Sequence, residues 1–225
     1  MKRHLTPLRS SIKAFANGVA LAVAWPCAVT CWIERRLSPA AEGVFGFWAE
    51  AFALLPGLPG LYLRRGFYRL TLENCSATAA IGFGALFSHR QARVEEDVYV
   101  GPYVVTGSVH LCKGCLIGTR VSLLSGSMQH EWLEQGGWTP SDPSRFKRIK
   151  IAEHVWIGEG ATVMADVGAG SMVAAGAVVS APIPAGVVVG GNPARFVRNV
   201  VRETACRDAA PQEEATRGES VQPVT

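Results

Sequence analysis

The residue best suited to chemistry in this chain is His130, which lies at the start of a polar stretch, QHEWLEQGGWTPSDPSRFKRIK, at residues 129–150. An imidazole with a pKa of about 6.5 can take a proton from a hydroxyl near neutral pH. The stretch interrupts a regular repeat, and loops that leave a rigid scaffold often carry function. His130 is therefore a candidate for proton-transfer chemistry, with a surface histidine of no function as the alternative. His89, His110 and His154 are expected in corners or faces of the repeat.

Cysteines offer a second kind of chemistry. There are six, at Cys27, Cys31, Cys75, Cys112, Cys115 and Cys206. The CKGC segment at 112–115 has the spacing of half a zinc site, but no second CxxC completes it. Cys115 also occupies a position of the repeat that requires a small residue. We expect six reduced thiols, no bound metal and no nucleophilic cysteine.

The repeat around these residues has a period of six, which is neither the helical 3.6 nor the strand 2.0. Each unit begins with an aliphatic residue followed by Gly or Ala, and its fifth residue is small. Strict copies begin at Val100, Ile117, Ile157, Val167 and Val173, and looser ones at Ile81, Val94, Leu111, Leu123 and Ile151. A low-complexity Gly/Ala segment would lack aliphatic residues in a fixed register. The period instead predicts a solenoid.

Each six-residue unit is expected to form a short flat strand and a tight corner. The aliphatic residue points inward, Gly or Ala permits the corner backbone, and the fifth residue must fit beneath the next coil. Three units then close one triangular coil. The register slips between Val100 and Leu111, and again between Val163 and Val167, and we expect bulges or tight corners there.

The pattern resembles the hexapeptide-repeat acyltransferases, and is most similar to the surface-polysaccharide, galactoside and xenobiotic O-acetyltransferases. The resemblance rests on the six-residue units, on SGSMQHE followed by a polar loop and VWIGEGA, and on a closing GNPAR segment. It implies a mainly β fold, a left-handed parallel β-helix, which is an exception to right-handed crossover. It also implies acetyl-CoA as cosubstrate, a homotrimer and His130 as the catalytic residue. With a histidine base, we expect the acetyl group to pass directly from acetyl-CoA to the acceptor, without an acyl-enzyme.

The same resemblance implies which residues bind the cosubstrate. PAGVVVGGNPARFVR at 184–198 matches the end of the coil, where arginines contact the nucleotide end of CoA, and guanidinium groups suit phosphate oxygens. Other matched positions line the pantetheine arm or, for a tryptophan, the acyl site. The resulting set is Trp156, Glu159, Ala175, Ser180, Arg195 and Arg198.

The acceptor is expected to be a hydroxyl of a sugar or polysaccharide in surface or exopolysaccharide biosynthesis, with a small xenobiotic as an alternative. A γ-type carbonic anhydrase on the same fold would need three histidines converging on zinc, and the chain lacks an HxxxxH pair on adjacent coils. A membrane-tethered scaffold without catalysis would have an empty loop and no CoA-binding arginines. The loop of this sequence carries His130 and the arginines are present, which favours catalysis over the scaffold, the alternative that stays open.

The N-terminal part differs in composition from the coil. The run AFANGVALAVAWPCAVTCWI at 14–33 carries no charge and is long enough to span a bilayer. The run at 44–63 is broken by Glu50, Pro56 and Pro59, which favours an interfacial position. Basic residues flank both runs, so we predict a shallow or hairpin anchor at the cytoplasmic face of the inner membrane. The alternatives are helices buried against the coil of a cytoplasmic protein, and a signal peptide, for which no clean cleavage site is present.

The predicted organisation is therefore an apolar helical, membrane-associated segment at 1–70, a β-helix at 71–200 with an active-site loop at 129–150, and a polar tail at 201–225. The tail lacks any period and is expected to be disordered. A net charge of +4 is mild, and the basic residues cluster near the apolar runs. They do not form the basic stripe of a nucleic-acid binder, so no nucleic-acid partner is expected.

Overall fold

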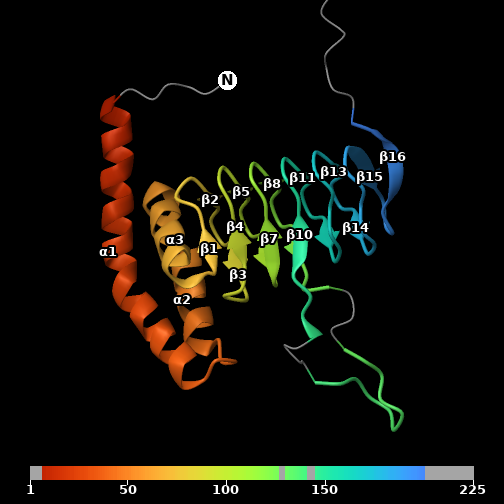
Figure 1. The fold of residues 1–225 in the computed structure, drawn as a ribbon, viewed down its shortest axis with the longest axis horizontal. Helices are drawn as coiled ribbons and strands as arrows, with labels where there is room; N and C mark the ends of the chain where they lie inside the picture. The colour runs from red at the N-terminus through yellow and green to blue at the C-terminus, as the bar shows by residue number, and fades with distance from the viewer. Residues whose placement is uncertain (1–6, 127–129, 141–144, 201–225) are drawn as a thin grey trace, which may run out of the picture.

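The structure, a computed structural model, describes residues 7–126, 130–140 and 145–200. A three-sided parallel β-solenoid carries a group of helices at its N-terminal end (Figure 1). The helices are α1 (Pro7–Leu37), α2 (Gly43–Ala53) and α3 (Gly57–Thr71). The predicted fold, a mainly β solenoid preceded by an apolar helical segment, is confirmed. The predicted tail lies outside the described residues.

Three sheets form the sides of the solenoid. The four-stranded sheet holds β1 (Asn74–Cys75), β4 (Arg93–Val94), β7 (Val109–Leu111) and β10 (Ile149–Ile151). The five-stranded sheet holds β3 (Leu86–Phe87), β6 (Val105–Thr106), β9 (Ser122–Leu123), β12 (Thr162–Val163) and β14 (Val178–Val179). The seven-stranded sheet holds β2 (Ala80–Ile81), β5 (Tyr99–Val100), β8 (Leu116–Ile117), β11 (Trp156–Ile157), β13 (Met172–Val173), β15 (Val187–Gly190) and β16 (Arg195–Asn199). Every pairing is parallel except β15 with β16.

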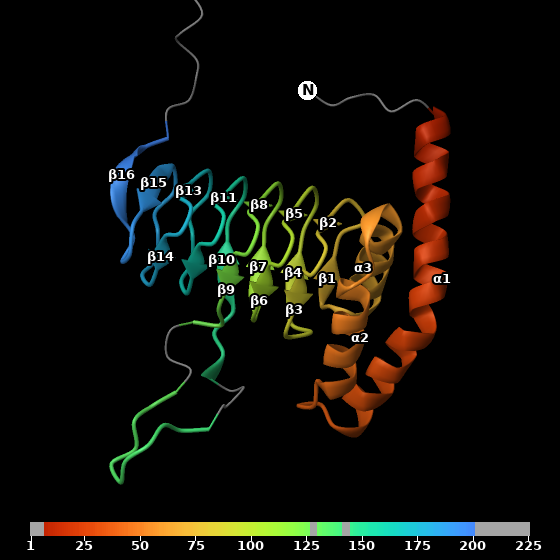
Figure 2. The same ribbon diagram turned by 180° about the vertical axis from the view of Figure 1, so that it is seen from behind.

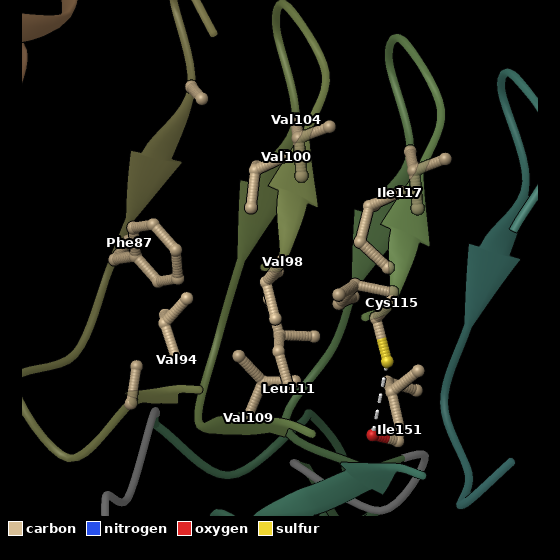
Figure 3. Packing of buried hydrophobic residues seen from close by; sticks show 14 of the residues in the cluster. Phe87, Val94, Val98, Val100, Val104, Val109, Leu111, Cys115, Ile117 and Ile151 are labelled. Carbon is tan, nitrogen blue, oxygen red and sulfur yellow. Dashed lines mark hydrogen bonds between the residues drawn. The ribbon is translucent and has the colours of Figure 1, made fainter. Parts of the chain in front are cut away.

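The aliphatic residue that begins each six-residue unit points into the solenoid. Successive residues of a strand face opposite sides, so a two-residue strand gives one outward and one inward side chain. In the seven-stranded sheet, Val100 pairs with Ile117, which pairs with Ile157, and all three are fully buried. Figure 3 shows Val100 and Ile117 in this core, with Leu111 and Ile151 across from them. The predicted inward register is confirmed.

The corners of the coils are as tight as the sequence predicted. A Cβ atom at Gly118 would lie 2.8 Å from the backbone nitrogen of Glu159 in the next coil, so only glycine fits there without a shift. The two register slips coincide with short corners. Only residues 107–108 separate β6 from β7, and Val167 pairs with Ile151 soon after β12 ends.

Helices α2 and α3 cover the first coil and belong to the same hydrophobic core. Phe45 and Phe52 from α2, with Phe67 and Tyr68 from α3, are buried in one cluster with the coil residue Phe87. The Tyr68 and Phe87 rings are 4.9 Å apart between centroids. The buried aromatic side chains of the run at 44–63 thus cover the open end of the coil, as the alternative of helices packed against the coil expects. The interfacial position of this run stays a prediction.

Two arginines of α3, counted among the membrane-flanking basic residues, are also buried against the coil. The Arg64 guanidinium donates to the carbonyls of Ile81 (3.1 Å) and Leu55 (2.6 Å), and Arg65 donates to the Ala79 carbonyl (3.0 Å). Burial lowers the pKa of both groups, but an arginine starts high enough to remain charged. These arginines fix α3 to the first coil.

Helix α1 packs on the far side of α3, and its other face is exposed. Ala20, Ala24 and Ala28 form its buried stripe. A Cβ atom at Gly66 of α3 would lie 2.9 Å from the Ala20 carbonyl oxygen, which shows how closely the two helices approach. The exposed face carries large apolar side chains, including Ile12, Phe15, Val19, Val23, Trp25 and Ile33. Residues 11–37 are long and apolar enough to cross a membrane.

The helical cap makes a prediction about stability. Phe67→Ala removes a fully buried ring that lies 4.9 Å from Phe52 and 5.4 Å from Tyr68, so we expect a loss of about 3–5 kcal/mol in the free energy of unfolding. Phe47→Ala is the matched control, because its side chain is 63% exposed and should cost under about 0.5 kcal/mol. Urea unfolding followed by circular dichroism measures both. Equal losses would show that the Phe67 ring is not buried within the cap.

Candidate active site

The inserted segment leaves the solenoid between β9 and β10, at the edge where the five-stranded and four-stranded sheets meet. Its two ends are joined by a backbone hydrogen bond from the Lys147 amide to the Ser125 carbonyl (3.0 Å), and the Gly126 amide donates to the Leu124 carbonyl (2.8 Å) in a local turn. The buried Ser125 hydroxyl accepts a bond from the Ser108 amide in the preceding coil (2.7 Å). Figure 2 shows the segment projecting away from the coil. Two hydrogen-bonded ends therefore carry an extended loop.

The described part of this loop has local structure of its own. Trp132 and Trp138 form an antiparallel bridge, and their rings meet edge to face with centroids 5.4 Å apart. Gly136 and Gly137 take positive φ angles of 89° and 96°, which allow the turn between the two tryptophans. Both tryptophans are more than 60% exposed, so their indole rings are accessible on the surface of the loop.

His130 lies on this loop with one ring nitrogen fixed. Its Nδ1 is 2.8 Å from the Thr139 carbonyl oxygen, and the neighbouring Glu131 amide donates to the Thr139 hydroxyl (2.9 Å). A carbonyl only accepts, so Nδ1 carries the proton in this bond and Nε2 is left with a free lone pair. The side chain is exposed. His130 is therefore oriented as a base, facing solvent within this single chain.

The predicted cosubstrate residues lie on other parts of the solenoid. Trp156 points outward from β11 and is 50% exposed, and Arg195 and Arg198 lie on β16, an exposed strand of the same seven-stranded sheet. Glu159 and Ala175 occupy successive corners between the seven-stranded and five-stranded sheets, where the Gly176 amide donates to the Glu159 carbonyl (2.8 Å). These five residues all lie on the seven-stranded sheet or in the corners that follow its strands.

Ser180 is the exception in that set. It follows β14 and precedes Ile183, which pairs with Val167 in line with β10. Ser180 therefore lies at the same edge of the solenoid as the loop with His130. Among the described residues, the hydrogen bonds of His130 run to Thr139, not to any of the predicted cosubstrate residues. One chain thus separates the base from most of the predicted CoA site.

A second oriented histidine was not predicted from the sequence. His89 Nδ1 is 2.6 Å from Glu42 Oε2, and the other carboxylate oxygen accepts from the Arg90 amide (2.9 Å). Burial would raise the pKa of Glu42, but the bonds from His89 and Arg90 outweigh it, so the pKa is lowered and the carboxylate is charged. No sequence spacing signals this pair, because Glu42 lies in the bend after α1, 47 residues before His89.

The remaining described histidines support the coil, as expected. His154 takes a positive φ of 56° at a corner, and His110 lies on the four-stranded sheet with Nε2 2.7 Å from Glu95 Oε1. Cys112 lies beside His110, with its sulfur 3.9 Å from that nitrogen. These contacts hold neighbouring coils together.

The cysteines have the character of structural thiols. The five within the described residues are unpaired, and Cys206 lies outside those residues. Cys115 points into the core, where its thiol donates to the Ala152 carbonyl at 2.9 Å, and Figure 3 marks its longer contact with Ile151. Burial raises the pKa of Cys115 to about 12, so the thiolate needed for nucleophilic attack is scarce at neutral pH.

Comparison with known proteins places these features in context. No protein-family model matches the chain. Over 132 residues it is 28% identical to WbbJ of Escherichia coli (strain K12), a protein assigned by name to O-acetyl transfer in lipopolysaccharide biosynthesis. That match covers 56% of this chain and 66% of WbbJ. The chain spans about two thirds or less of the length of the curated relatives it matches.

Solved structures share the solenoid. A hexapeptide-repeat acetyltransferase of Vibrio cholerae, VCA0836, complexed with acetyl-CoA, aligns with 72% of this chain and 92% of its own, at 20% identity and a TM-score of 0.58. Galactoside acetyltransferase in complex with coenzyme A aligns with 71% of this chain and 81% of its own, at 19% identity and a TM-score of 0.59. At these identities the likeness establishes the fold.

The six-residue units, the three-sided parallel coil and the closing strand define a hexapeptide-repeat solenoid. The chain shares this fold with hexapeptide-repeat acetyltransferases of known structure, and its sequence is similar to that of one O-acetyl transferase relative.

Proposed function

We propose that this protein transfers an acetyl group from acetyl-CoA to a hydroxyl of a sugar, as a step in surface or exopolysaccharide biosynthesis. The observation that carries the proposal is His130, held through Nδ1 by the Thr139 carbonyl on a loop that leaves an acetyltransferase coil. Two relatives with this coil hold acetyl-CoA or CoA, and the WbbJ relative is assigned to lipopolysaccharide O-acetyl transfer. These relatives support the cosubstrate and the acceptor class.

The proposed reaction uses one base and no covalent intermediate on the protein. Nε2 of His130 takes the proton of the acceptor hydroxyl while that oxygen attacks the thioester carbonyl carbon. The carbon–sulfur bond then breaks, and the imidazolium returns its proton to the leaving thiolate of CoA. The products are an acetyl ester and free CoA. The buried, protonated thiol of Cys115 is unsuited to forming an acyl-enzyme.

The active site is proposed to form between chains of a homotrimer. The outward side chains of three adjacent strands in the seven-stranded sheet, Tyr99, Leu116 and Trp156, are 44–50% exposed and form an apolar column. Such a column suits burial against another subunit. His130 projects from the edge opposite that sheet. Packing this loop of one chain toward the seven-stranded sheet of the next would bring the base to Trp156 and the arginines.

Helix α1 is proposed to hold the protein at the cytoplasmic face of the inner membrane. Because its alanine stripe packs on α3, α1 lies along the protein, with only one face left for lipid. That face carries Phe15 and Val19 near one end and Ile33 near the other, followed by the exposed Arg35 and Arg36. An amphipathic helix with basic residues at its end suits the bilayer interface. We therefore propose an interfacial position for α1.

The first prediction tests the base. His130→Ala should lower acetyl transfer by roughly two to four orders of magnitude, the usual range for loss of a positioned base. Acetyl-CoA binding, measured by calorimetry, should stay near that of the native protein, because the proposed binding contacts to CoA come from other residues. Cys112→Ser and Cys115→Ser are the controls and should keep most of the rate. Near-normal turnover by His130→Ala would refute the role of His130.

The second prediction tests the shared site. Trimers formed by mixing His130→Ala subunits with Trp156→Ala subunits should recover part of the activity that each variant lacks alone. Recovery requires that one chain provide the base and its neighbour the tryptophan. Activity is measured after subunit exchange, and self-mixed variants are the control. If exchanged trimers show no recovery, each site lies within one chain.

The third prediction tests the membrane contact. Phe15→Glu combined with Val19→Glu should abolish co-sedimentation with vesicles of mixed zwitterionic and anionic phospholipid, because two charges would enter the apolar face. Phe196→Glu on β16 is the control, since it alters an equally exposed aromatic residue at the opposite end of the solenoid. It should leave sedimentation unchanged. Binding that survives the double substitution would remove α1 from the interface.

A further inference from the structure

A pocket lies between the bend that follows α1, the early coils and the base of the inserted loop. It has a volume of about 290 Å³. Pro39 and Glu42 line it from the bend, His89 and Gln91 from the coil, and Phe146 and Arg148 from the loop. Segments far apart in the sequence thus meet at one site, at the junction of the helical cap and the solenoid. Such junctions are where small-molecule sites are commonly found.

The polar groups of this pocket are oriented before any ligand arrives. The bond from His89 Nδ1 to Glu42 leaves the other ring nitrogen for a ligand, and the His89 ring packs against Phe146 with centroids 4.9 Å apart. Arg148 is held by Glu73 through Nη2 (2.5 Å). This ion pair fixes the guanidinium of Arg148 at the wall of the pocket.

The chemistry of the lining fits a sugar ring. Sugar hydroxyls both donate and accept, and the pocket offers an imidazole, an amide from Gln91, a guanidinium and a carboxylate. Phe146 and Pro39 offer apolar surface for the C–H face of the ring. The volume is at the small end of ligand sites, which suits one monosaccharide unit.

The position of the pocket separates it from the predicted cosubstrate residues. Arg195 and Arg198 lie on β16, at the opposite end of the solenoid from the helical cap (Figure 1). The pocket is lined by residues next to that cap. Neighbouring hollows that share Pro39 continue from the pocket to Arg35 and Trp32 at the end of α1. The loop that contributes Phe146 also carries His130. The pocket therefore connects the proposed membrane-facing helix to the loop of the proposed base.

From these observations we propose that the pocket binds one sugar unit of the acceptor, with His89, Gln91, Phe146 and Arg148 as its binding residues. The inference rests on the proposed acetyl transfer to a sugar and adds the place where that acceptor is recognised. Glu42 acts through His89 as a positioning residue, because its carboxylate fixes the imidazole.

The test measures sugar binding directly, in the full chain and without acetyl-CoA. The probes are methyl α-glucoside, methyl β-galactoside, N-acetylglucosamine and glucuronate. Binding of each probe is measured by saturation-transfer difference NMR. At least one probe should bind, and Phe146→Ala and Gln91→Ala should each weaken that binding about tenfold or more, the effect of removing a central contact. Phe47→Ala, an exposed aromatic residue outside the pocket, is the matched control and should bind as the native protein does. Thermal melting confirms that every variant is folded.

The outcomes separate this inference from the proposed function. His130→Ala should still bind the probe sugar, because the base is not part of the pocket. If sugar binds in the predicted way but no acetyl transfer is found, the pocket stands and the proposed activity fails. If a sugar is acetylated but Phe146→Ala and Gln91→Ala leave its KM unchanged, the activity stands and the pocket is not the acceptor site. Failure of the native protein to bind any of the four probes also overturns the pocket.

Discussion

Close stacking of backbone on backbone is the constraint on which this structure depends. The Gly101 amide donates to the Ile117 carbonyl in the next coil, and the Gly118 amide to Ile157, both at 2.8 Å. A side chain at Gly118 would collide with the following coil. Each coil is therefore supported only by its neighbours, as in other solenoids. The apolar interior must then be closed where the series of coils begins.

The helical segment closes the apolar interior at the first coil. It also extends to the edge of the solenoid from which the inserted loop leaves. Helices α2 and α3 bury aromatic rings on the first coil, while the bend after α1 is held by Glu42. Arg90, in the early part of the coil, also pairs with Glu34 near the end of α1 (2.9 Å). A cap required for stability thus brings Glu42 next to His89 and Phe146. The same contacts that close the core also shape a polar pocket.

The sequence predicted the features that arise from local geometry. Inward aliphatic residues such as Ile117 and Ile157, and the small buried residue at Ala161, follow from a period that every coil must obey. Features that depend on distant contacts were not predictable. Arg64 and Arg65 look like membrane-flanking charges in the sequence, yet carbonyls at the end of the first coil accept their hydrogen bonds. The Glu42–His89 pair was not predictable for the same reason, because no local pattern indicates a contact between residues so far apart in the sequence.

The geometry of a triangular coil also bears on where a complete active site can form. The loop of His130 leaves the edge between the five-stranded and four-stranded sheets, and that edge is opposite the seven-stranded sheet that carries Trp156 and Arg195. A rigid core of buried aliphatic residues lies between these two parts of a chain. The proposed base at one edge would therefore reach cosubstrate bound, as proposed, at the opposite face most directly on a neighbouring chain. The pocket at Phe146 lies at the base of the same loop, so an acceptor held there stays on the chain that provides His130. Acceptor and base would then come from one chain and the acetyl donor from the next.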